Sequence, residues 1–543
     1  MKLNPKLFKG LINREQALYC PVYSPFILLA IVLTLSIVYD FHEILQLRPQ
    51  GTHQWRQCDC LSITASFYRG DADFFQPEIY NLLGDNQGRT ISEFPLIYYL
   101  VSLLWKIFGR HEWIFRLLNF IISICGMLAI LRISERVIRD SFWGLFAAAV
   151  FFTSGIYVYY SLNFLMNTIA LNMALIGWYF FFRYYPEGRT VYLYLTFFFF
   201  LIGGLLKITS LLSFLALCCL FILDRTGSFP DKYKKNIFRN KSDFIIPALL
   251  VVITILAWIS YVRYYNSMWN KNVFLVGILP VWDLSNQEIR ETFENIRKIW
   301  LEQYFYRPLH VFFLTGLLSV WIFHKRTEPV LLSITTLLSA GSVSVVVLFF
   351  GALGNHDYYM IDLLILSVFI MLSFFYLLNN TQLKTDILHL PLTRILAAII
   401  VVLAAAHTSK EIDRRFKGWH NRRHLTQFYG YAEIEPYLDS IGLGPSKKVI
   451  SLNDPSINIT LYLMDRKGWT QYGTEMKDST MIARRIRMGA EYLVHHRPVD
   501  SLDGSHWKYF LKGEAGRFEN VIIKRIGFPD NVPSFSDSID PAH

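Results

Sequence analysis

Long apolar segments recur along this chain, and they restrict its fold more than any other feature. A helix that crosses a bilayer needs about 20 apolar residues, because roughly 30 Å of hydrocarbon is crossed at about 1.5 Å per residue. The sequence predicts eleven such spans, at residues 25–45, 113–131, 141–160, 163–183, 191–206, 208–223, 244–265, 308–324, 329–350, 357–378 and 392–408. A chain with this pattern is a polytopic membrane protein, which excludes a cytosolic enzyme, a disordered chain and a disulfide-framed secreted domain.

Composition agrees with this interpretation. Charged residues make up 17% of the 543 residues and hydrophobic residues 53%, whereas ordinary globular chains carry about 25% charged residues. Of the six cysteines, Cys58 and Cys60 could form a redox or metal pair, but no second pair accompanies them, so unpaired thiols are favoured. Lys2, Lys6 and Lys9 precede the first span without a small-residue cleavage site, which predicts a retained first helix.

Segment 93–109 is apolar but short, and it begins with Glu93 and Pro95 and carries Lys106 near its end. These features favour an amphipathic helix in the membrane interface over a twelfth span. With this segment left on the surface, the short basic loops at 132–140, 224–243 and 324–326 fall on the same side as the N-terminus. Short loops rich in Lys and Arg mark the cytoplasm. The long loops 46–112 and 266–307, and the chain from residue 409 onward, are therefore expected outside.

From residue 409 the apolar runs shorten and charges become frequent, which predicts a small extracytoplasmic α/β domain at 409–543 after a membrane domain at 1–408. Short buried strands are expected at residues 447–452, 490–494 and 520–525, with helices near 432–441, 456–464 and 479–489.

The first external loop, 46–112, carries the strongest candidates for chemistry. Trp55, Arg56 and Gln57 precede Asp59, and Glu93 follows later in the loop. An acid beside an arginine at a membrane surface can act as a general base, or it can bind a metal or a cationic substrate. The alternative is a solvated loop whose charges cap helices.

Other polar residues fall at the expected outer ends of spans. Lys207 stands between two apolar segments, where it either snorkels or binds an anion. An aromatic belt explains Tyr358 beside His356 and Asp357, but not His and Asp together. Snorkelling accounts for Arg116 at the start of the second span. Helix capping is the simple alternative for two further residues at the start of the fourth span, Asn163 and Asn167.

The string from Trp55 to Asp59, followed by Glu93-Phe-Pro-Leu96 and by the segment from Gly109 to Arg116, resembles the bacterial branch of the dolichyl-phosphate-mannose–protein mannosyltransferase family. The aminoarabinose transferases of lipid A are relatives in the same superfamily. Leu206-Lys207, the string 355–359 and Arg466-Lys-Gly-Trp469 also look like this branch. The resemblance implies an all-α membrane domain of GT-C type with interfacial helices in the first external loop.

Carried over by position, the resemblance implies that Asp59 is the catalytic carboxylate and that Lys207 lies near a lipid phosphate. It also implies that His356 and Tyr358 face the same cavity as Lys207, and we add Arg56 as a candidate phosphate ligand. Candidates for acceptor binding or support are Trp55, Gln57, Glu93, Arg116, Asn167 and Asp357. Many relatives have an acid where this chain has Asn167, which argues against a divalent metal held by two acids. No metal and no other cofactor are therefore expected.

The expected activity is transfer of a sugar from a polyprenyl-phosphate donor to an acceptor hydroxyl on a protein, lipid or glycan. The expected location is a bacterial inner membrane with the site facing the periplasm, and the expected partners include membrane lipids but no nucleic acid. Two alternatives remain. A polysaccharide ligase or polymerase would use the same kind of donor. A secondary transporter is disfavoured because the sequence has no inverted repeat and its charged residues gather at one face.

Overall fold

The computed structural model describes residues 19–228, 237–270, 273–274, 277–380, 387–417, 428–473, 479–496 and 509–528. The chain forms two compact units. The helical unit comprises Met1–Leu47, His111–Tyr261 and Val276–Phe416, and the α/β unit comprises Arg48–Arg110, Val262–Leu275 and Lys417–His543. Most of the loop at residues 46–112 thus belongs to the same compact unit as the C-terminal region, which the sequence predicted as a separate domain. The basic N-terminal residues Lys2, Lys6 and Lys9 lie outside the described residues.

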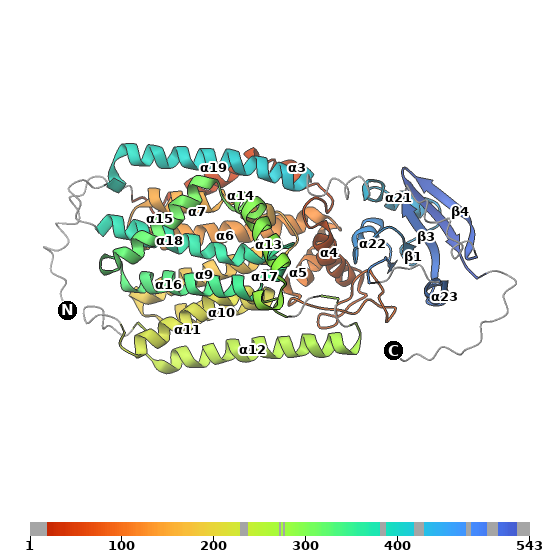
Figure 1. Cartoon of the computed structure of the whole chain (residues 1–543), viewed down its shortest axis with the longest axis horizontal. Helices are drawn as coiled ribbons and strands as arrows, with labels where there is room; N and C mark the ends of the chain where they lie inside the picture. Colours follow the sequence, from red (N-terminus) through yellow and green to blue (C-terminus); the bar gives the residue numbers. More distant parts are fainter. Residues whose placement is uncertain are drawn as a thin grey trace. The chain divides into compact units, whose positions relative to one another are not determined.

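Each of the eleven predicted spans coincides with helical structure (Figure 1). The longer helices are α2 (Ser24–Val38), α6 (Glu112–Ile138), α7 (Ser141–Phe151), α9 (Met166–Glu187), α10 (Thr190–Leu206), α11 (Leu211–Arg225), α12 (Lys241–Met268), α13 (Asn286–Asn295), α15 (Arg307–Ile322), α16 (Pro329–Leu348), α18 (Leu364–Asn380) and α19 (Pro391–Lys417). Short elements between them are α3 (Phe41–Ile44), α8 (Gly155–Ser161), the 3₁₀ turn η1 (Ile208–Ser210), the π-helical turn η4 (Ile296–Trp300), α14 (Leu301–Tyr304), α17 (Phe350–Leu353) and the 3₁₀ segment η6 (Asp357–Leu363).

By length and composition, six described helices are long and apolar enough to cross a membrane, or eight if each of two bent helix pairs forms one span. The count of eleven spans therefore stays a prediction. One bent pair is α7 and α8, which were predicted from the sequence as a single span at 141–160. The two helices meet at 76°, and the Ser154 hydroxyl accepts the backbone N–H of Tyr157 to begin α8.

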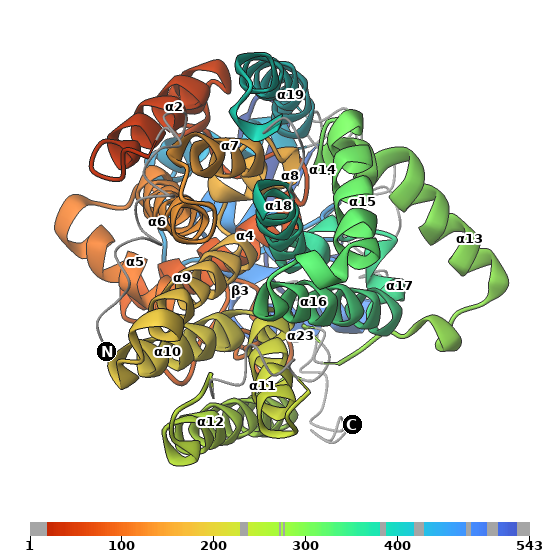
Figure 2. The same ribbon diagram turned by 90° about the vertical axis from the view of Figure 1, so that its left-hand side faces the viewer.

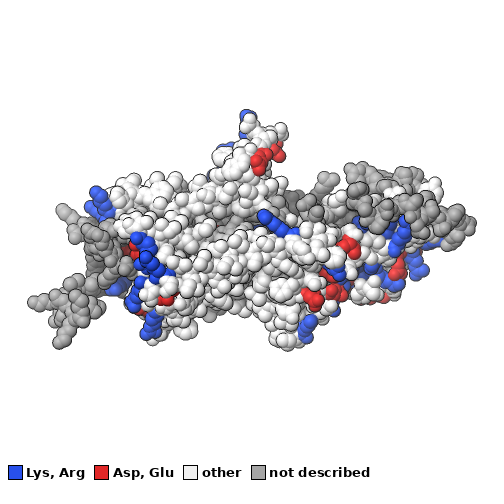
Figure 3. Space-filling model, turned by 90° about the horizontal axis from the view of Figure 1, so that it is seen from below, with Lys and Arg blue, Asp and Glu red and all other residues white. Residues whose placement is uncertain are grey.

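Within the helical unit, α9 packs against both α6 and α10, as the view along the helices shows (Figure 2). Figure 3 shows a broad surface without charge over this unit and Lys and Arg gathered at one end. Apolar side chains along α12, including Ile246, Leu249 and Ile253, are exposed. Uncharged helix faces of this kind suit contact with lipid, where a charged side chain would be costly.

The α/β unit contains α4 (Gln54–Arg69), α5 (Leu96–Phe108), α21 (Glu435–Ser440), α22 (Ile459–Met464), α23 (Ser479–Arg487) and a five-stranded sheet of order β2-β1-β3-β5-β4. Its strands are β1 (Lys448–Ser451), β2 (Gly468–Trp469), β3 (Ala490–His496), β4 (Leu511–Phe518) and β5 (Val521–Ile526). β1 pairs in parallel with β2 and β3, whereas β5 is antiparallel to β3 and β4. The three predicted strands are present as β1, β3 and β5. Strands β2 and β4 were not predicted. β2 has only two residues, and half of the residues of β4 are exposed.

The loop at residues 46–112 pairs with this sheet. The backbone N–H of Leu82 donates to the carbonyl of Gly468 at 2.7 Å, and the N–H of Gly468 donates to the carbonyl of Tyr80 at 3.1 Å. Leu82 also lies in the apolar core of the sheet, in contact with residues such as Trp469 and Leu493. Because a buried backbone group needs a partner, this pairing fixes the loop against a segment almost 400 residues later in the sequence.

Helix α5, the expected interfacial helix, has 13 residues and is therefore about 20 Å long, which is less than the hydrocarbon core of a bilayer. One face, which includes Tyr98, Val101 and Trp105, is buried. The opposite face exposes Leu100, Leu103 and Ile107. A short helix with an exposed apolar face is the type of element that lies in a membrane interface.

Asp465 connects the loop to the C-terminal region through ion pairs. Its carboxylate accepts the Tyr80 hydroxyl at 2.6 Å, pairs with Arg69 at 2.5 Å and also pairs with Arg110. Removing this carboxylate would leave two largely buried arginines without their acid.

We expect Asp465→Ala to destabilise the α/β unit by about 3–5 kcal/mol, because breaking a buried ion pair leaves an uncompensated charge. The measurement is thermal unfolding in detergent, together with the rate of limited proteolysis in the first loop. Glu514→Ala, which removes an exposed pair with Arg517, is the control and should change stability by less than about 1 kcal/mol. Equal stability of the two variants would contradict the anchoring role of Asp465.

Candidate active site

The site in the α/β unit is built on α4. The chain enters this helix through left-handed backbone at Gly51 (φ 76°) and His53 (φ 57°), a conformation that costs least at glycine. The side-chain amide of Gln57 donates to the carbonyls of Gln50 at 2.8 Å and Thr52 at 3.0 Å. Gln57 therefore holds the turn before the helix, which is a supporting position and not one that faces a substrate.

Arg56 and Asp59 stand three residues apart, so they share one face of α4. The Arg56 guanidinium donates to both carboxylate oxygens of Glu93, at 2.5 and 2.6 Å, and lies 3.9 Å from the nearer oxygen of Asp59. Its carbon lies 4.9 Å from the ring centre of Phe274. Arg56 therefore pairs mainly with Glu93. Its interaction with Asp59 is weaker because the two groups are farther apart.

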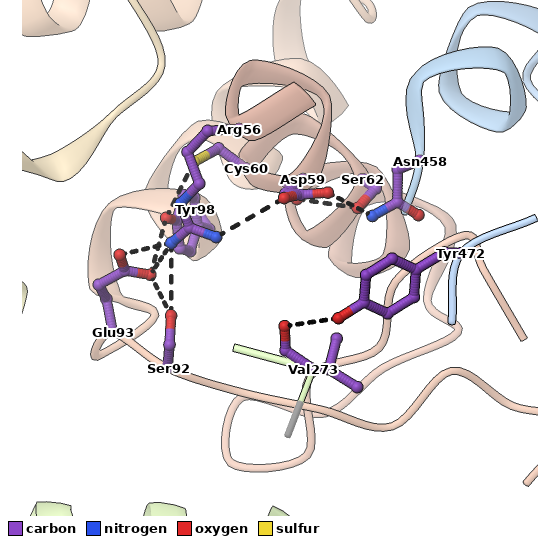
Figure 4. A network of polar contacts seen from close by, with 10 residues as sticks. All are labelled: Arg56, Asp59, Cys60, Ser62, Ser92, Glu93, Tyr98, Val273, Asn458 and Tyr472. Atoms are coloured by element: carbon purple, nitrogen blue, oxygen red, sulfur yellow. Dashed lines mark hydrogen bonds and ion pairs between the residues drawn. The ribbon is translucent and has the colours of Figure 1, made fainter. Parts of the chain in front are cut away.

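Asp59 is 2% exposed. One carboxylate oxygen accepts a hydrogen bond of 2.8 Å from the side-chain amide of Asn458, which comes from the start of α22 (Figure 4). Burial raises the pKa of Asp59 to about 7, and Arg56 and Asn458 oppose this rise while the charge of Glu93 adds to it. A carboxyl group with a pKa near 7 takes up and releases a proton in the range where general bases work.

Two aromatic side chains stand beside this carboxylate. Trp55, which is 38% exposed, packs edge to face with Tyr472 at 5.8 Å between ring centres. The Tyr472 hydroxyl donates to the carbonyl of Val273 at 3.2 Å. Burial raises the pKa of Tyr472, and the charge of Asp59 raises it further, which shows that the phenol lies within electrostatic range of the carboxylate.

Cys58 and Cys60 on α4 are both thiols, and they form no disulfide. Cys60 accepts the Tyr98 hydroxyl at 3.3 Å, and burial raises its pKa to about 12. The thiol is therefore protonated at neutral pH and is a poor nucleophile or metal ligand. The interpretation of the cysteines as unpaired thiols agrees with this geometry.

A second cluster of predicted residues lies in the helical unit. Lys207 follows the end of α10, where its extended backbone (φ −151°) breaks the helix. Its ammonium lies 4.4 Å from the ring centre of Tyr359 and 5.7 Å from that of Tyr358. The ring of His356 lies 5.3 Å from that of Tyr358. The structure thus brings Lys207, Tyr358 and His356 together, as the resemblance implied, whereas Arg56 belongs to the α/β unit.

Asp357 is an anchor within the helical unit. Its carboxylate accepts the Tyr160 hydroxyl at 2.7 Å and pairs with Arg415 of α19 at 2.5 Å, and both members of the pair are fully buried. Arg415 also donates to Gln303 at 2.6 Å. This network ties η6 to α8, α14 and α19, and it therefore fixes the backbone next to His356 and Tyr358.

Asn167 and Arg116 also bind backbone in the helical unit. The Asn167 amide donates to the carbonyl of Tyr358 at 3.0 Å, so the helix-capping alternative for Asn167 is wrong. Arg116 is fully buried and donates to the carbonyls of Leu162 at 3.1 Å and of Leu47. The snorkelling explanation for Arg116 is therefore wrong as well, because its charge is held by main-chain oxygens inside the protein.

Among the described residues, no group of three or more His, Cys, Asp and Glu side chains could hold a metal ion. Independence of a metal nevertheless stays a prediction. Three residues of these networks were not predicted from the sequence, because each lies far in sequence from its partner: Asn458, Tyr472 and Arg415. Arg415 could have been identified as a candidate from the sequence, because it is a charged residue in the helix that continues the last apolar segment.

The comparisons with known proteins bear on both units. Residues 92–261 match the sequence model of the family described as dolichyl-phosphate-mannose-protein mannosyltransferase. A crystal structure of ArnT from Cupriavidus metallidurans bound to undecaprenyl phosphate is similar, with a TM-score of 0.62 at 11% identity, over 92% of this chain and 97% of that one. The chain has the GT-C glycosyltransferase fold. The predicted GT-C fold with a small C-terminal α/β region is confirmed, and the resemblance to the mannosyltransferase family is confirmed over residues 92–261.

Two other solved structures share this fold at lower similarity. The archaeal oligosaccharyltransferase AglB from Archaeoglobus fulgidus, in complex with an inhibitory peptide and a dolichol-phosphate, matches with a TM-score of 0.52 at 12% identity, over 95% of this chain and 76% of that one. The arabinofuranosyltransferase AftD from Mycobacteria matches with a TM-score of 0.50 at 13% identity, over 93% of this chain and 40% of that one. None of the curated protein sequences compared with the chain matches it.

We expect Glu93→Gln to lower the pKa of Asp59 from its value of about 7. The substitution removes a charge that raises this pKa, and it frees Arg56 to pair with Asp59; an opposite charge within about 4–6 Å lowers a carboxyl pKa by about 1–3 units. The measurement is an infrared titration of the Asp59 carboxyl band, identified by its loss in Asp59→Asn. Glu78→Gln, which loses a pair with Lys467 instead, is the control. A pKa that stays constant or rises in Glu93→Gln would contradict the charge arrangement described here.

Proposed function

We propose that this protein is a glycosyltransferase that moves a sugar from a polyprenyl-phosphate carrier to an acceptor hydroxyl at the outer face of the membrane. The observation that carries the proposal is the buried Asp59, whose pKa of about 7 suits a general base, within a GT-C fold. The structures named above support the donor class, since one relative binds undecaprenyl phosphate and another a dolichol-phosphate.

Displacement of a lipid phosphate from the anomeric carbon of a sugar requires proton removal from the acceptor hydroxyl. A carboxylate can take this proton as the hydroxyl becomes acidic in the transition state. Asp59 suits this role because Asn458 occupies only one of its lone pairs and Arg56 is 3.9 Å away. Trp55 and Tyr472, beside Asp59, are candidates for acceptor contacts.

The same reaction develops negative charge on the leaving phosphate. A cation in a water-poor environment stabilises such charge better than one in bulk water. Lys207 is the candidate for this role in the helical unit, where aromatic faces surround its ammonium. His356 and Tyr358 are candidate donors to the phosphate, and the Asp357–Arg415 pair supports their backbone. Arg56 is a weaker candidate for the phosphate than the sequence indicated, because Glu93 already binds its guanidinium.

We propose further that the protein resides in a bacterial inner membrane with Asp59 on the periplasmic side, and that no divalent metal is needed. The loop-charge pattern supports the orientation. Asn167, where many relatives have an acid, supports metal independence. A ligase or polymerase would differ in the size of the unit transferred, and a secondary transporter would release no polyprenyl phosphate.

The decisive experiment uses the purified full chain in detergent, a polyprenyl-phosphate sugar and a membrane extract as the source of acceptor. Release of polyprenyl phosphate and labelling of an acceptor support the transferase, and the assay is run with and without EDTA. Mass spectrometry of the labelled product separates transfer of one sugar from transfer of a chain. Absence of release with all acceptor extracts would overturn the proposed function and favour the transporter.

We expect Asp59→Asn to lower turnover by about 10² or more, because the amide keeps the shape of the side chain but cannot accept the proton. Binding of the lipid donor should persist, and this is measured by donor titration alongside turnover. Asp85→Asn, in the same loop, is the control, because its carboxylate accepts only nearby backbone N–H groups. Turnover close to that of the wild type in folded Asp59→Asn would contradict the role of Asp59.

We expect Lys207→Met to weaken donor binding and turnover together, because the charge that binds the phosphate is lost. Lys207→Arg should restore part of the binding but less of the turnover, since a planar guanidinium replaces a compact ammonium. The measurements are donor affinity and initial rate for each variant. Lys410→Met, which removes an exposed lysine of α19 in the same unit, is the control. Unchanged affinity and rate in Lys207→Met would show that Lys207 only snorkels to the membrane surface.

A further inference from the structure

The role of the C-terminal region follows from one side chain that it places against Asp59. Asn458 stands immediately before α22, it is fully buried, and its side-chain nitrogen donates to Asp59 at 2.8 Å. The two residues are 399 positions apart in the sequence but belong to the same compact unit. Among the described hydrogen bonds, this one connects the sheet-bearing C-terminal region to the candidate base.

The orientation of the Asn458 amide is fixed by its second hydrogen bond. Its side-chain oxygen accepts the backbone N–H of Asn81 at 2.9 Å. A backbone N–H can only donate, so it must face the oxygen of the amide, and the NH₂ group then faces Asp59. A donor directed at a carboxylate favours its charged form. The geometry therefore excludes a flipped amide, whose oxygen would repel the Asp59 carboxylate.

The position of Asn81 is itself fixed by several bonds. Its side chain donates to the carbonyl of Ile457 and to the hydroxyl of Thr470, each at 3.0 Å, and accepts the N–H of Leu83 at 3.0 Å. Asn81 and Asn458 thus form a chain of bonds that begins in the sheet-bearing region and ends at Asp59. Such fully bonded buried networks are rigid, because each unmade bond would cost the desolvation of its polar group.

We propose that Asn458 is a positioning residue for the base, and that the C-terminal region serves the reaction by holding the Asp59 carboxylate in its charged form and in one orientation. This inference rests on the proposed function for its catalytic meaning. The competing explanation gives Asn458 a purely structural role at the start of α22 and against Asn81. The two explanations differ in one measurable quantity, the proton affinity of Asp59.

The charged and titratable groups that face Asp59 come from four segments. Arg56 and Cys60 stand on α4 itself, Glu93 lies before α5, Asp454 lies before α22, and Tyr472 follows β2. Arg56 favours the carboxylate, whereas Glu93 and Asp454 oppose it. With Arg56 bound mainly to Glu93, the neutral donor of Asn458 is the closest partner of the carboxylate. Its removal should therefore have a measurable effect.

Two variants test the inference. Asn458→Leu keeps the approximate volume and removes both hydrogen bonds. Asn458→Asp keeps an acceptor for the N–H of Asn81, so it retains the local structure, but it places a second carboxyl beside Asp59. Asn458→Leu should raise the pKa of Asp59 by about one unit, which is a tenfold change in proton affinity. Asn458→Asp should raise the upper pKa of the carboxyl pair further, because two adjacent acids share a proton. Asn270→Ala is the matched control, because it removes another buried amide that binds backbone in this unit, at Gly84 and Arg89, without contacting Asp59.

The first readout needs no substrate. An infrared titration of the Asp59 carboxyl band gives its pKa in the wild type, in both Asn458 variants and in Asn270→Ala. We expect an upward shift in both Asn458 variants and none in the control. A pKa equal to that of the wild type in either folded Asn458 variant would overturn the positioning role, whatever the protein catalyses.

The second readout is the pH dependence of kcat/KM for sugar transfer. Activity that needs the charged form of Asp59 rises with pH through its pKa, so a raised pKa moves this limb to higher pH. At pH 6 Asn458→Leu should lose about tenfold relative to the wild type and should recover most of that loss at pH 9. A loss that is the same at both pH values would overturn the inference and leave the proposed function standing. Absence of transfer by the wild type itself would instead overturn the proposed function, while the infrared result would still test the position of Asn458.

Discussion

A charge buried inside this protein has to be compensated by groups close to it, because the cost of desolvating an ion is several kcal/mol. The compensation takes different forms at different acids. Asp357 has a direct partner in Arg415 at 2.5 Å and a tyrosine hydroxyl at 2.7 Å. Asp465 has two arginines and a tyrosine hydroxyl. The charge of each of these two acids is compensated by arginine, and their hydrogen-bond networks connect distant segments of the chain.

Asp59 differs from them in how its charge is balanced. Its arginine lies 3.9 Å away and is bound more closely to Glu93, so the carboxylate has a neutral amide as its nearest donor. Incomplete compensation is the reason that burial can raise its pKa to about 7. The same property suits Asp59 to the exchange of a proton at neutral pH. Structural acids and the candidate base can thus be told apart by their partners, although all three are buried.

The sequence predicted much of the fold because hydropathy and loop charge are local properties. Each apolar segment coincides with helical structure, and the strands at 448–451, 490–496 and 521–526 agree with the expected ones. The break between α7 and α8 was missed although Ser154 and Gly155 form a turn-type pair there, because the apolar residues on both sides read as one continuous span. Strand β4 was missed because none of its residues is buried and it contains two glycines, so no alternation of buried residues marks it.

The candidate site was predictable only in its local part. Arg56 and Asp59 are three residues apart, and helical periodicity places them on one face. Lys207, His356 and Tyr358 were grouped by resemblance, and the structure brings them together. The Asn458 contact could not be inferred, because nothing in the sequence indicates that a segment after residue 450 pairs with the loop at residues 80–82. Long-range pairing of this kind depends on the complete sheet and its core.

The pairing of the loop with the C-terminal sheet also explains how α4, a short helix with many polar residues, can hold a base in place. Isolated helices of this length are marginal in water, and α4 has 16 residues that include Gln54, Arg56, Gln57 and Asp59. Its conformation depends on the turn fixed by Gln57 and on the packing of α4 against α5 and α22. The groups that orient the Asp59 carboxylate and favour its ionised form are held in place by the core of the C-terminal region. The geometry of Asp59 therefore depends on the whole α/β unit.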